Sequence, residues 1–199
     1  TTRSNSALIS YTKLSPNHSG KRTKKIDTVT IHCMAGQLSV ESCGALFAKS
    51  SKGASSNYGI DTDGRIALYV DEANRSWCTS SNVNDQRAVT IEVANNGGAP
   101  DWPVSAKAYA ALLDLVTDIC KRNGIKRLVW STSKNDRMNH LNGCNMTVHR
   151  DYANKSCPGD YLYNRHGQIA AEVNKRLGVK DAGSSTGGQT SGSTETGLK

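Results

Sequence analysis

Residues 87–94 constrain the fold of this chain more strongly than any other segment. They read Arg-Ala-Val-Thr-Ile-Glu-Val-Ala, and the breaker run Asn-Asn-Gly-Gly follows them. A short stretch that is rich in β-branched residues and ends at turn residues predicts a buried strand. Residues 27–33 have the same character and predict a second strand. Residues 87–94 also contain one carboxylate, Glu92, within an otherwise apolar run.

Three segments have the apolar spacing and the terminal residues of helices. The clearest begins at Ser105, and an Asn-Gly pair ends it at Gly124. A second helix is expected from the N-cap residue Ser39 to about residue 50. A third is expected to begin at Asp160 and to end at Gly178. The apolar residues of each lie on one face, which predicts packing against another layer.

The remaining segments predict strands and loops. Residues 57–61 and 65–70 flank a Thr-Asp-Gly turn, which indicates a β-hairpin. Residues 125–130 predict a further strand, and residues 131–147 predict a polar loop that is long enough to suggest a functional role. Residues 1–26 are polar and are expected to form an irregular lead-in.

The charge balance narrows the classes of partner. Lys and Arg number 25 against 17 Asp and Glu, which leaves a net charge of +8. This excess suits an anionic partner, for example a cell-wall polymer. The basic residues are scattered and have no helix-turn-helix or zinc-finger spacing, so no nucleic acid partner is expected. No apolar run approaches the roughly 20 residues that cross a bilayer, so no membrane insertion is expected.

The six cysteines contain no Cys-x-x-Cys pair. A disulfide framework is typical of small secreted domains, and a chain of this length buries enough surface to form a core without one. We therefore expect most of the cysteines to be small, buried apolar side chains. Cys157 is the exception, because of its neighbours in the sequence.

The composition changes at about residue 180. Residues 1–180 are expected to form one domain. Residues 181–199 consist largely of Gly, Ser and Thr, which predicts a flexible linker to a C-terminal domain that this sequence does not include. The first thirty residues lack the charged start and the apolar stretch of a secretory signal, which favours synthesis in the cytoplasm.

Two histidines and one cysteine suggest a metal site. His32 lies on the strand predicted at residues 27–33, and His149 precedes Cys157 by a short segment. Two imidazoles and one thiolate, with a fourth position open, form a catalytic zinc site. Each of these residues taken alone is more often structural than a ligand, so the spacing by itself leaves both interpretations open.

Two charged residues are candidates for chemistry beside such a metal. Glu92 is costly to bury unless it is paired or useful, and it suits a general base next to a metal-bound water. It also suits the partly solvated face of a strand. Lys155 lies two residues before Cys157, so an extended backbone points both side chains to one side. It suits an oxyanion stabiliser, and it also suits an ordinary surface lysine.

Several motifs occur along the chain in a characteristic order. They are Val29-Thr-Ile-His32, Ser56-Asn-Tyr-Gly-Ile60 with Asp63-Gly64, Thr90-Ile-Glu-Val93, Val148-His-Arg-Asp151 and Lys155-Ser-Cys-Pro-Gly159. Together they resemble the zinc-dependent N-acetylmuramoyl-L-alanine amidases, a superfamily that also contains the peptidoglycan recognition proteins. The resemblance covers residues 26–178 and is greatest to the amidase domains of phage endolysins from Gram-positive hosts.

The resemblance implies one Zn²⁺ per chain, bound by His32, His149 and Cys157. It implies that Glu92 activates water and that Lys155 stabilises the oxyanion. The implied fold is α/β, with a mixed central sheet and helices on both of its faces. The implied reaction is hydrolysis of the amide between N-acetylmuramic acid and L-alanine in bacterial peptidoglycan, which lyses the cell wall. The implied protein is an endolysin made in the host cytoplasm and released by lysis, or a bacterial autolysin.

The resemblance also suggests contacts in a shallow substrate groove. Asn57, Tyr58 and Trp77 are the candidates. Packing is an alternative role for Tyr58, and a place at the edge of the core is an alternative for Trp77. Some relatives have a catalytic tyrosine where Ser56 stands here, but Glu92 paired with Lys155 matches the other catalytic branch.

Other functions remain as alternatives. The first is a non-catalytic module that recognises peptidoglycan, although such members typically lack the cysteine ligand. The second is a nucleic-acid-binding protein, which only the net charge favours. The third is a structural zinc protein, although structural sites are usually closed by four protein ligands. Of the remaining histidines, His166 is expected to face solvent, and His140 lies in the long polar loop, where a place near the groove stays open.

Overall fold

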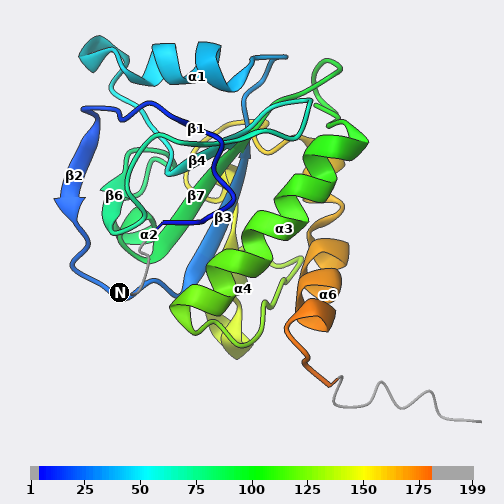
Figure 1. The fold of residues 1–199 in the computed structure, drawn as a ribbon. Coiled ribbons are helices and arrows are strands. Elements are labelled where there is room, and N and C mark those ends of the chain that lie inside the picture. Colours follow the sequence, from blue (N-terminus) through cyan, green and yellow to red (C-terminus); the bar gives the residue numbers. More distant parts are fainter. Residues whose placement is uncertain (1–4, 181–199) are drawn as a thin grey trace, which may run out of the picture.

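The structure is a computed structural model that describes residues 5–180. The linker expected at residues 181–199 lies outside the described residues. A six-stranded mixed sheet forms the centre (Figure 1). From edge to edge its strands are β1 (Tyr11–Thr12), β5 (Ile66–Leu68), β4 (Tyr58–Ile60), β7 (Ala88–Val93), β3 (Thr28–Cys33) and β8 (Met146–Thr147). Neighbouring strands are parallel except β4 and β5, which form the predicted hairpin.

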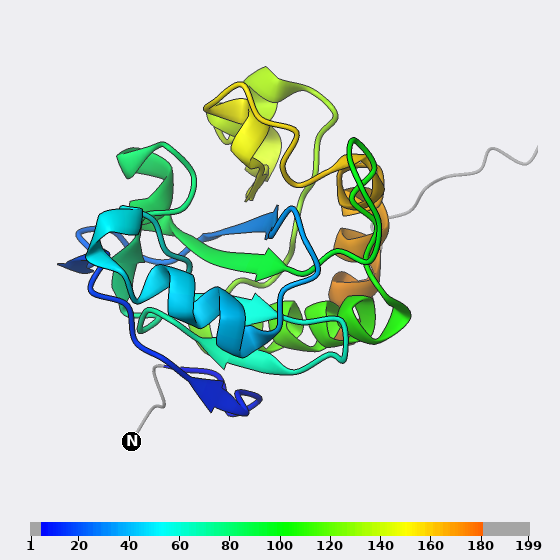
Figure 2. The same ribbon diagram turned by 90° about the horizontal axis from the view of Figure 1, so that it is seen from above.

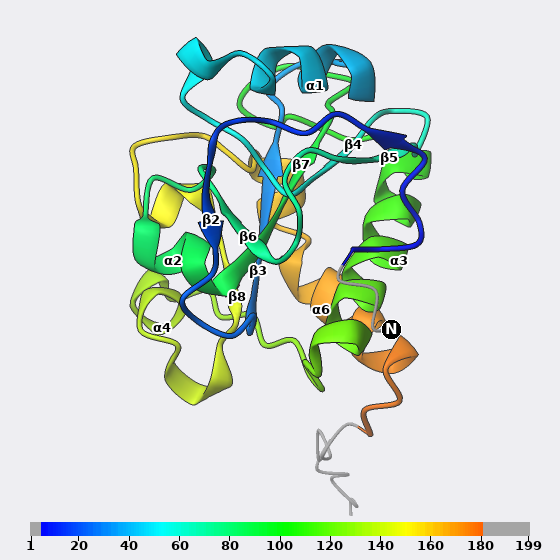
Figure 3. The same cartoon turned by 60° about the vertical axis from the view of Figure 1, so that its left-hand side comes forward.

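Helices cover both faces of this sheet, which confirms the expected fold class. Figure 3 shows α3 and α6 on the right of the sheet and α2 and α4 on the left, while α1 crosses the top. Seen from above, α1 lies over strands of the sheet (Figure 2). These helices are α1 (Val40–Phe47), α2 (Asn82–Arg87), α3 (Ala106–Asn123), α4 (Lys134–Met138) and α6 (His166–Arg176).

Strand alternation separates the core from the opposite face. Val29, Ile31, Val89 and Ile91 are fully buried in the cluster that includes α3 and α6. Their neighbours along β3 and β7 point the other way, because successive side chains of a strand alternate. Ala67 of β5 points to that second side, where it packs with residues of α1.

The helix termini follow the sequence closely. Ser39 and Ser105 are the N-caps of α1 and α3, and each side chain accepts a hydrogen bond from a backbone amide in the first turn. Gly124 ends α3 with a φ of 67°, a conformation that favours glycine. These local signals were sufficient because each involves residues only a few positions apart.

The strand expected at residues 125–130 was wrong. Within the described chain this segment is irregular, because asparagine side chains take the place of a neighbouring strand. Leu128 exchanges both of its backbone hydrogen bonds with the amide group of Asn174. The backbone of Val129 is bonded to Asn145 through that residue's backbone amide and its side-chain oxygen.

Three further expectations needed correction. The last helix is split into α5 (Asp160–Tyr163) and α6, because Arg165 between them has non-helical ψ. The polar loop at residues 131–147 contains α4, the 3₁₀ turn η2 (Leu141–Gly143) and β8. The lead-in contains β1 and also β2 (His18–Lys21), which pairs antiparallel with β6 (Asn74–Ser76). The other 3₁₀ turns are η1 (Ser50–Lys52) and η3 (His149–Asp151).

Within residues 5–180, none of the helices has both the length and the apolar character needed to cross a bilayer.

Candidate metal centre

The pairing of two parallel strands positions the first two residues of the site. In β3 and β7, His32 lies directly opposite Glu92, and Gly59 of β4 lies opposite Glu92 on its other side. All three belong to the face of the sheet that points away from α3. A side chain at position 59 does not fit there, since a Cβ would come within 2.4 Å of the Tyr69 ring. The strand pairing therefore sets an imidazole and a carboxylate side by side.

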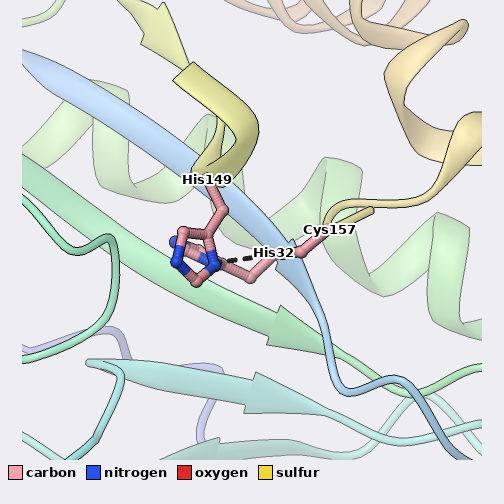
Figure 4. Close-up of side chains that lie close together, drawn as sticks. All are labelled: His32, His149 and Cys157. Atoms are coloured by element: carbon pink, nitrogen blue, oxygen red, sulfur yellow. Dashed lines mark hydrogen bonds between the residues drawn. The ribbon is translucent and has the colours of Figure 1, made fainter. Parts of the chain in front are cut away.

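The other two metal-ligand candidates come from the segment after β8. The Cys157 thiol lies 3.3 Å from His32 Nδ1, and the His149 ring centroid lies 5.1 Å from that of His32 (Figure 4). One potential ligand atom from each residue lies within 4.8 Å of the others. Two imidazoles and a thiol are a donor set that suits zinc with an open fourth position. The residues present therefore fit the expected ion.

Each imidazole is oriented by a hydroxyl group. His32 Nε2 lies 3.1 Å from Thr79 Oγ1, and His149 Nε2 lies 3.0 Å from Ser80 Oγ. The tautomer that leaves Nδ1 free for a metal carries its proton on Nε2, where it can donate to these oxygens. Burial lowers the pKa of His32 well below its usual value and also lowers the pKa of His149. Both rings are thus neutral near pH 7, which is the form that binds metal.

Glu92 borders a pocket of about 410 Å³ beside these ligands. Its Oε1 atom accepts a hydrogen bond from the Cys78 thiol at 3.7 Å. Its Oε2 atom is buried and has no hydrogen-bond partner among the described residues. Burial, and then the proximity of Cys33, raise the pKa of Glu92 to about 8. A buried carboxylate oxygen without a partner, on a residue that lines a pocket, is a typical place for a water molecule or a proton.

A model of the N-acetylmuramoyl-L-alanine amidase family matches residues 22–160, which is most of the chain and includes the four candidates described above and Lys155. The chain belongs to this family. A comparison with curated protein sequences finds no match.

Solved structures show the same fold at low sequence identity. PlyL is 17% identical with a TM-score of 0.58, over 82% of this chain and 95% of that chain. The Staphylococcus aureus hydrolase AmiA is 13% identical with a TM-score of 0.63, over 84% of this chain and 82% of that one. Drosophila peptidoglycan recognition protein SA is 16% identical with a TM-score of 0.56, over 79% of this chain and 90% of that one. These comparisons establish the amidase fold of this chain.

Two residues predicted to be near the site reach its pocket. Lys155 lines the pocket with an exposed side chain. Trp77 also lines it, is 39% exposed, and donates a hydrogen bond from Nε1 to Ser19 Oγ at 2.7 Å. An exposed indole at a pocket rim can stack on a ligand, so Trp77 stays a candidate substrate contact.

The other two predicted groove contacts, Asn57 and Tyr58, were wrong. Both are fully buried. The Asn57 amide nitrogen lies 3.2 Å from each of the backbone carbonyls of Val70, Asp71 and Asn74. The Tyr58 hydroxyl donates to Glu72 and accepts from a backbone amide. These side chains hold neighbouring loops together, so they do not line the pocket.

The remaining cysteines and histidines differ partly from expectation. Four cysteines are buried, and all six are free thiols. Cys78 differs from the expected buried, apolar cysteine, because it is only partly buried and its thiol bonds to Glu92 in the pocket. His166 was expected to face solvent but is fully buried. The half-buried His140 bonds to the Cys144 carbonyl oxygen at 2.9 Å.

Sequence reasoning missed the segment formed by Cys78, Thr79 and Ser80. Its polar residues precede α2 and resemble an ordinary helix N-terminus. Only the folded structure brings them to the site, because β6 ends just before them and turns the chain toward β3. Cys78 also completes a second group of potential ligands, together with His32 and Glu92.

Proposed function

We propose that this amidase-family chain is a zinc-dependent N-acetylmuramoyl-L-alanine amidase. It hydrolyses the amide that joins the lactyl group of N-acetylmuramic acid to L-alanine in bacterial peptidoglycan. The observation that carries the proposal is the convergence of His32, His149 and Cys157 in one cluster, of which His149 and Cys157 line the same pocket as Glu92. A binding module has no need of a carboxylate with a buried, unpaired oxygen at this place.

The proposed ligands of one Zn²⁺ per chain are His32 Nδ1, His149 Nδ1 and the Cys157 thiolate. A zinc ion bound there supplies Lewis acidity and lowers the pKa of a bound water toward ~7. A hydrogen bond from the Cys157 thiol to the Cys33 side chain, together with burial, raises the pKa of Cys157 well above its usual value in the metal-free protein. Cys157 therefore releases a proton when it becomes a ligand.

Glu92 is the proposed general base. Its carboxylate takes a proton from the attacking water and returns it to the departing alanine nitrogen, because an amide nitrogen leaves poorly unless it is protonated. Lys155 is the proposed oxyanion stabiliser. Its ammonium group lines the same pocket and can donate to the carbonyl oxygen as negative charge develops there.

The biological setting follows from the motifs and the charge. We infer a catalytic domain at residues 1–180 of a bacteriolytic enzyme that resembles phage endolysins, made in a host cytoplasm and released by lysis. The net charge of +8 supports an anionic cell wall as the place of action. The proposal includes no nucleic acid partner.

Product analysis tests the function. Purified Gram-positive peptidoglycan is digested with and without a zinc chelator. We expect new N-terminal alanine, no new reducing sugar ends, and loss of activity on chelation that added zinc restores. New reducing ends would instead indicate a glycosidase. Tight binding to the wall without cleavage would favour a recognition module.

A further inference from the structure

We propose that Cys78, Thr79 and Ser80, held in place by Asp85, form a positioning segment that orients three groups of the site at once. This inference rests on the proposed function, because it assigns the role of these residues toward the zinc ligands and the base. Three consecutive side chains each contact a different site residue. Cys78 contacts Glu92, Thr79 contacts His32, and Ser80 contacts His149.

The contacts of Thr79 and Ser80 are those that orient a metal-binding histidine. A histidine that binds metal through Nδ1 must be held by its other nitrogen, since this fixes both the tautomer and the direction of the ring. The hydroxyls of Thr79 and Ser80 lie 3.1 and 3.0 Å from the Nε2 atoms of His32 and His149. Thr79 is fully buried, so water cannot replace its hydroxyl.

The backbone of the segment is held by one buried carboxylate. Asp85 of α2 is 3% exposed, and its Oδ2 atom accepts hydrogen bonds from the backbone amides of Cys78 and Thr79, each at 3.0 Å. Burial of an acid is costly unless it is fully hydrogen-bonded. Asp85 therefore ties the position of the segment to α2.

The conformation of Ser80 indicates that the segment is held in an unfavourable shape. Its φ is 60°, a left-handed conformation that is uncommon for residues other than glycine. Such conformations persist where the surrounding structure imposes them, and they concentrate at functional sites. Here the strained residue is the one whose hydroxyl reaches His149, so the strain accompanies the contact.

The cysteine of the segment has a separate role. The Cys78 thiol donates to Glu92 Oε1 at 3.7 Å, whereas Glu92 Oε2 has no partner within the described chain. One oxygen of the carboxylate is thus held by the thiol, and this contact also fixes the direction of the other oxygen. Thr79 and Ser80 are positioning residues for metal binding, and Cys78 is a positioning residue for the base.

The first test measures zinc affinity by chelator competition, apart from activity. Removal of a hydrogen bond to a metal-binding histidine typically weakens metal affinity by about 10–100-fold, so we expect a loss of this size in Thr79→Val. The Ser80 hydroxyl is exposed and water can partly replace it, so Ser80→Ala should weaken zinc affinity less. Thr117→Val is the matched control. Thr117 is a buried threonine of α3 that bonds to a helix carbonyl at 2.7 Å, and its loss should leave zinc affinity unchanged.

The second test asks whether Asp85 acts through the segment. If it does, Asp85→Ala already displaces Thr79, and the double variant Asp85→Ala/Thr79→Val should bind zinc no more weakly than Asp85→Ala alone. Independent sites would give losses that multiply. If Asp85→Ala fails to fold, the Thr79 and Ser80 variants still decide the proposal.

The third test separates the base from the ligands. Cys78→Ala should lower kcat by about three- to tenfold, the effect of one weak hydrogen bond, with zinc affinity unchanged. Cys78→Ser keeps a donor at this position and should restore most of the rate. A Cys78→Ala variant with wild-type kcat would overturn the role of Cys78.

The outcomes distinguish this inference from the function on which it rests. A wild-type protein that binds no zinc would overturn both. A wild-type protein that binds zinc and cleaves the amide, with Thr79→Val and Ser80→Ala of undiminished zinc affinity, would overturn the positioning segment alone.

Discussion

The two faces of the central sheet share the same strands but have opposite chemistry. On β3 and β7, Val29, Ile31, Val89 and Ile91 pack beneath α3 and α6 with no exposed surface. The intervening residues of the same strands are Thr30, His32, Thr90 and Glu92, and they engage in hydrogen bonds or face the pocket. One face stabilises the fold by excluding water, and the other holds polar groups at fixed separations.

This comparison teaches how a short strand can serve two purposes. The apolar face anchors β3 and β7 so firmly that the register between His32 and Glu92 cannot slip. A slip of one residue would exchange the two faces and expose the core. The proposed chemistry therefore depends on the packing of Val29, Ile31, Val89 and Ile91, although none of these four residues lines the pocket.

The largest expected effect is the loss of turnover when Glu92 on the polar face is changed. Glu92→Gln keeps the shape of the side chain but removes its basicity, so turnover should fall by about 10³-fold while zinc content and thermal stability stay near wild type. Glu172→Gln, at a partly exposed glutamate of α6 that pairs with Arg176 and does not line the pocket, is the control and should retain full activity. Near-native turnover in Glu92→Gln would exclude Glu92 as the base.

On the apolar face we expect a substitution to have an effect of similar free energy, but on stability instead of turnover. Ile91→Ala removes a fully buried side chain beside Glu92 and should reduce the free energy of unfolding by about 3 kcal/mol. The folded fraction should still bind zinc. Chemical denaturation measures the loss, and Val83→Ala, at a side chain that is 76% exposed, should change stability by less than about 0.5 kcal/mol. Equal losses of stability in Ile91→Ala and Val83→Ala would show that the apolar face does not stabilise the fold more than an exposed position does.

The next effect concerns an ionisable group in the layer that covers the apolar face. Burial lowers the pKa of His166 to about 4, below the value near 6.5 of the unfolded chain. The unfolded state therefore binds more protons between these values, and stability should fall as the pH drops from about 6.5 toward 4. The loss attributable to this group approaches about 3 kcal/mol at the acid end.

A variant isolates that contribution. His166→Phe keeps an aromatic ring against Trp130, whose ring centroid lies 4.5 Å from that of His166, but it cannot titrate. Urea unfolding of both zinc-loaded proteins from pH 7 to pH 4 should show a shallower pH slope for the variant. Identical slopes would mean that His166 is protonated equally in the folded and unfolded states.

The smallest expected effect tests whether Tyr58 packs in the interior or contacts the substrate. Tyr58→Phe removes a buried hydroxyl that bonds to Glu72 and to the Ser6 amide. It should cost about 1–2 kcal/mol of stability and leave KM unchanged. Tyr109→Phe, at a half-buried tyrosine of α3, is the control for stability. A raised KM in Tyr58→Phe would return Tyr58 to the groove.

Local sequence patterns predicted much of the fold and part of the site. The helix at Ser105, the hairpin around Asp63 and the two central strands depend on residues close together in the chain, and the structure has them. The metal-ligand candidates His32, His149 and Cys157 were selected by motif, and the structure brings them together. The strand expected at residues 125–130 failed because Asn145 and Asn174 occupy its hydrogen-bonding groups.

The sequence by itself determined which residues of each strand point to the same side, since alternation follows from the backbone alone. Only the tertiary structure decided that Asn57 and Tyr58 are buried, that His166 lies in the interior, and that Thr79 reaches His32 across 47 positions of the chain. The physical reason is the range of the interactions. Periodicity and capping act over a few residues, whereas strand register and burial arise from contacts between distant segments, which no local pattern encodes.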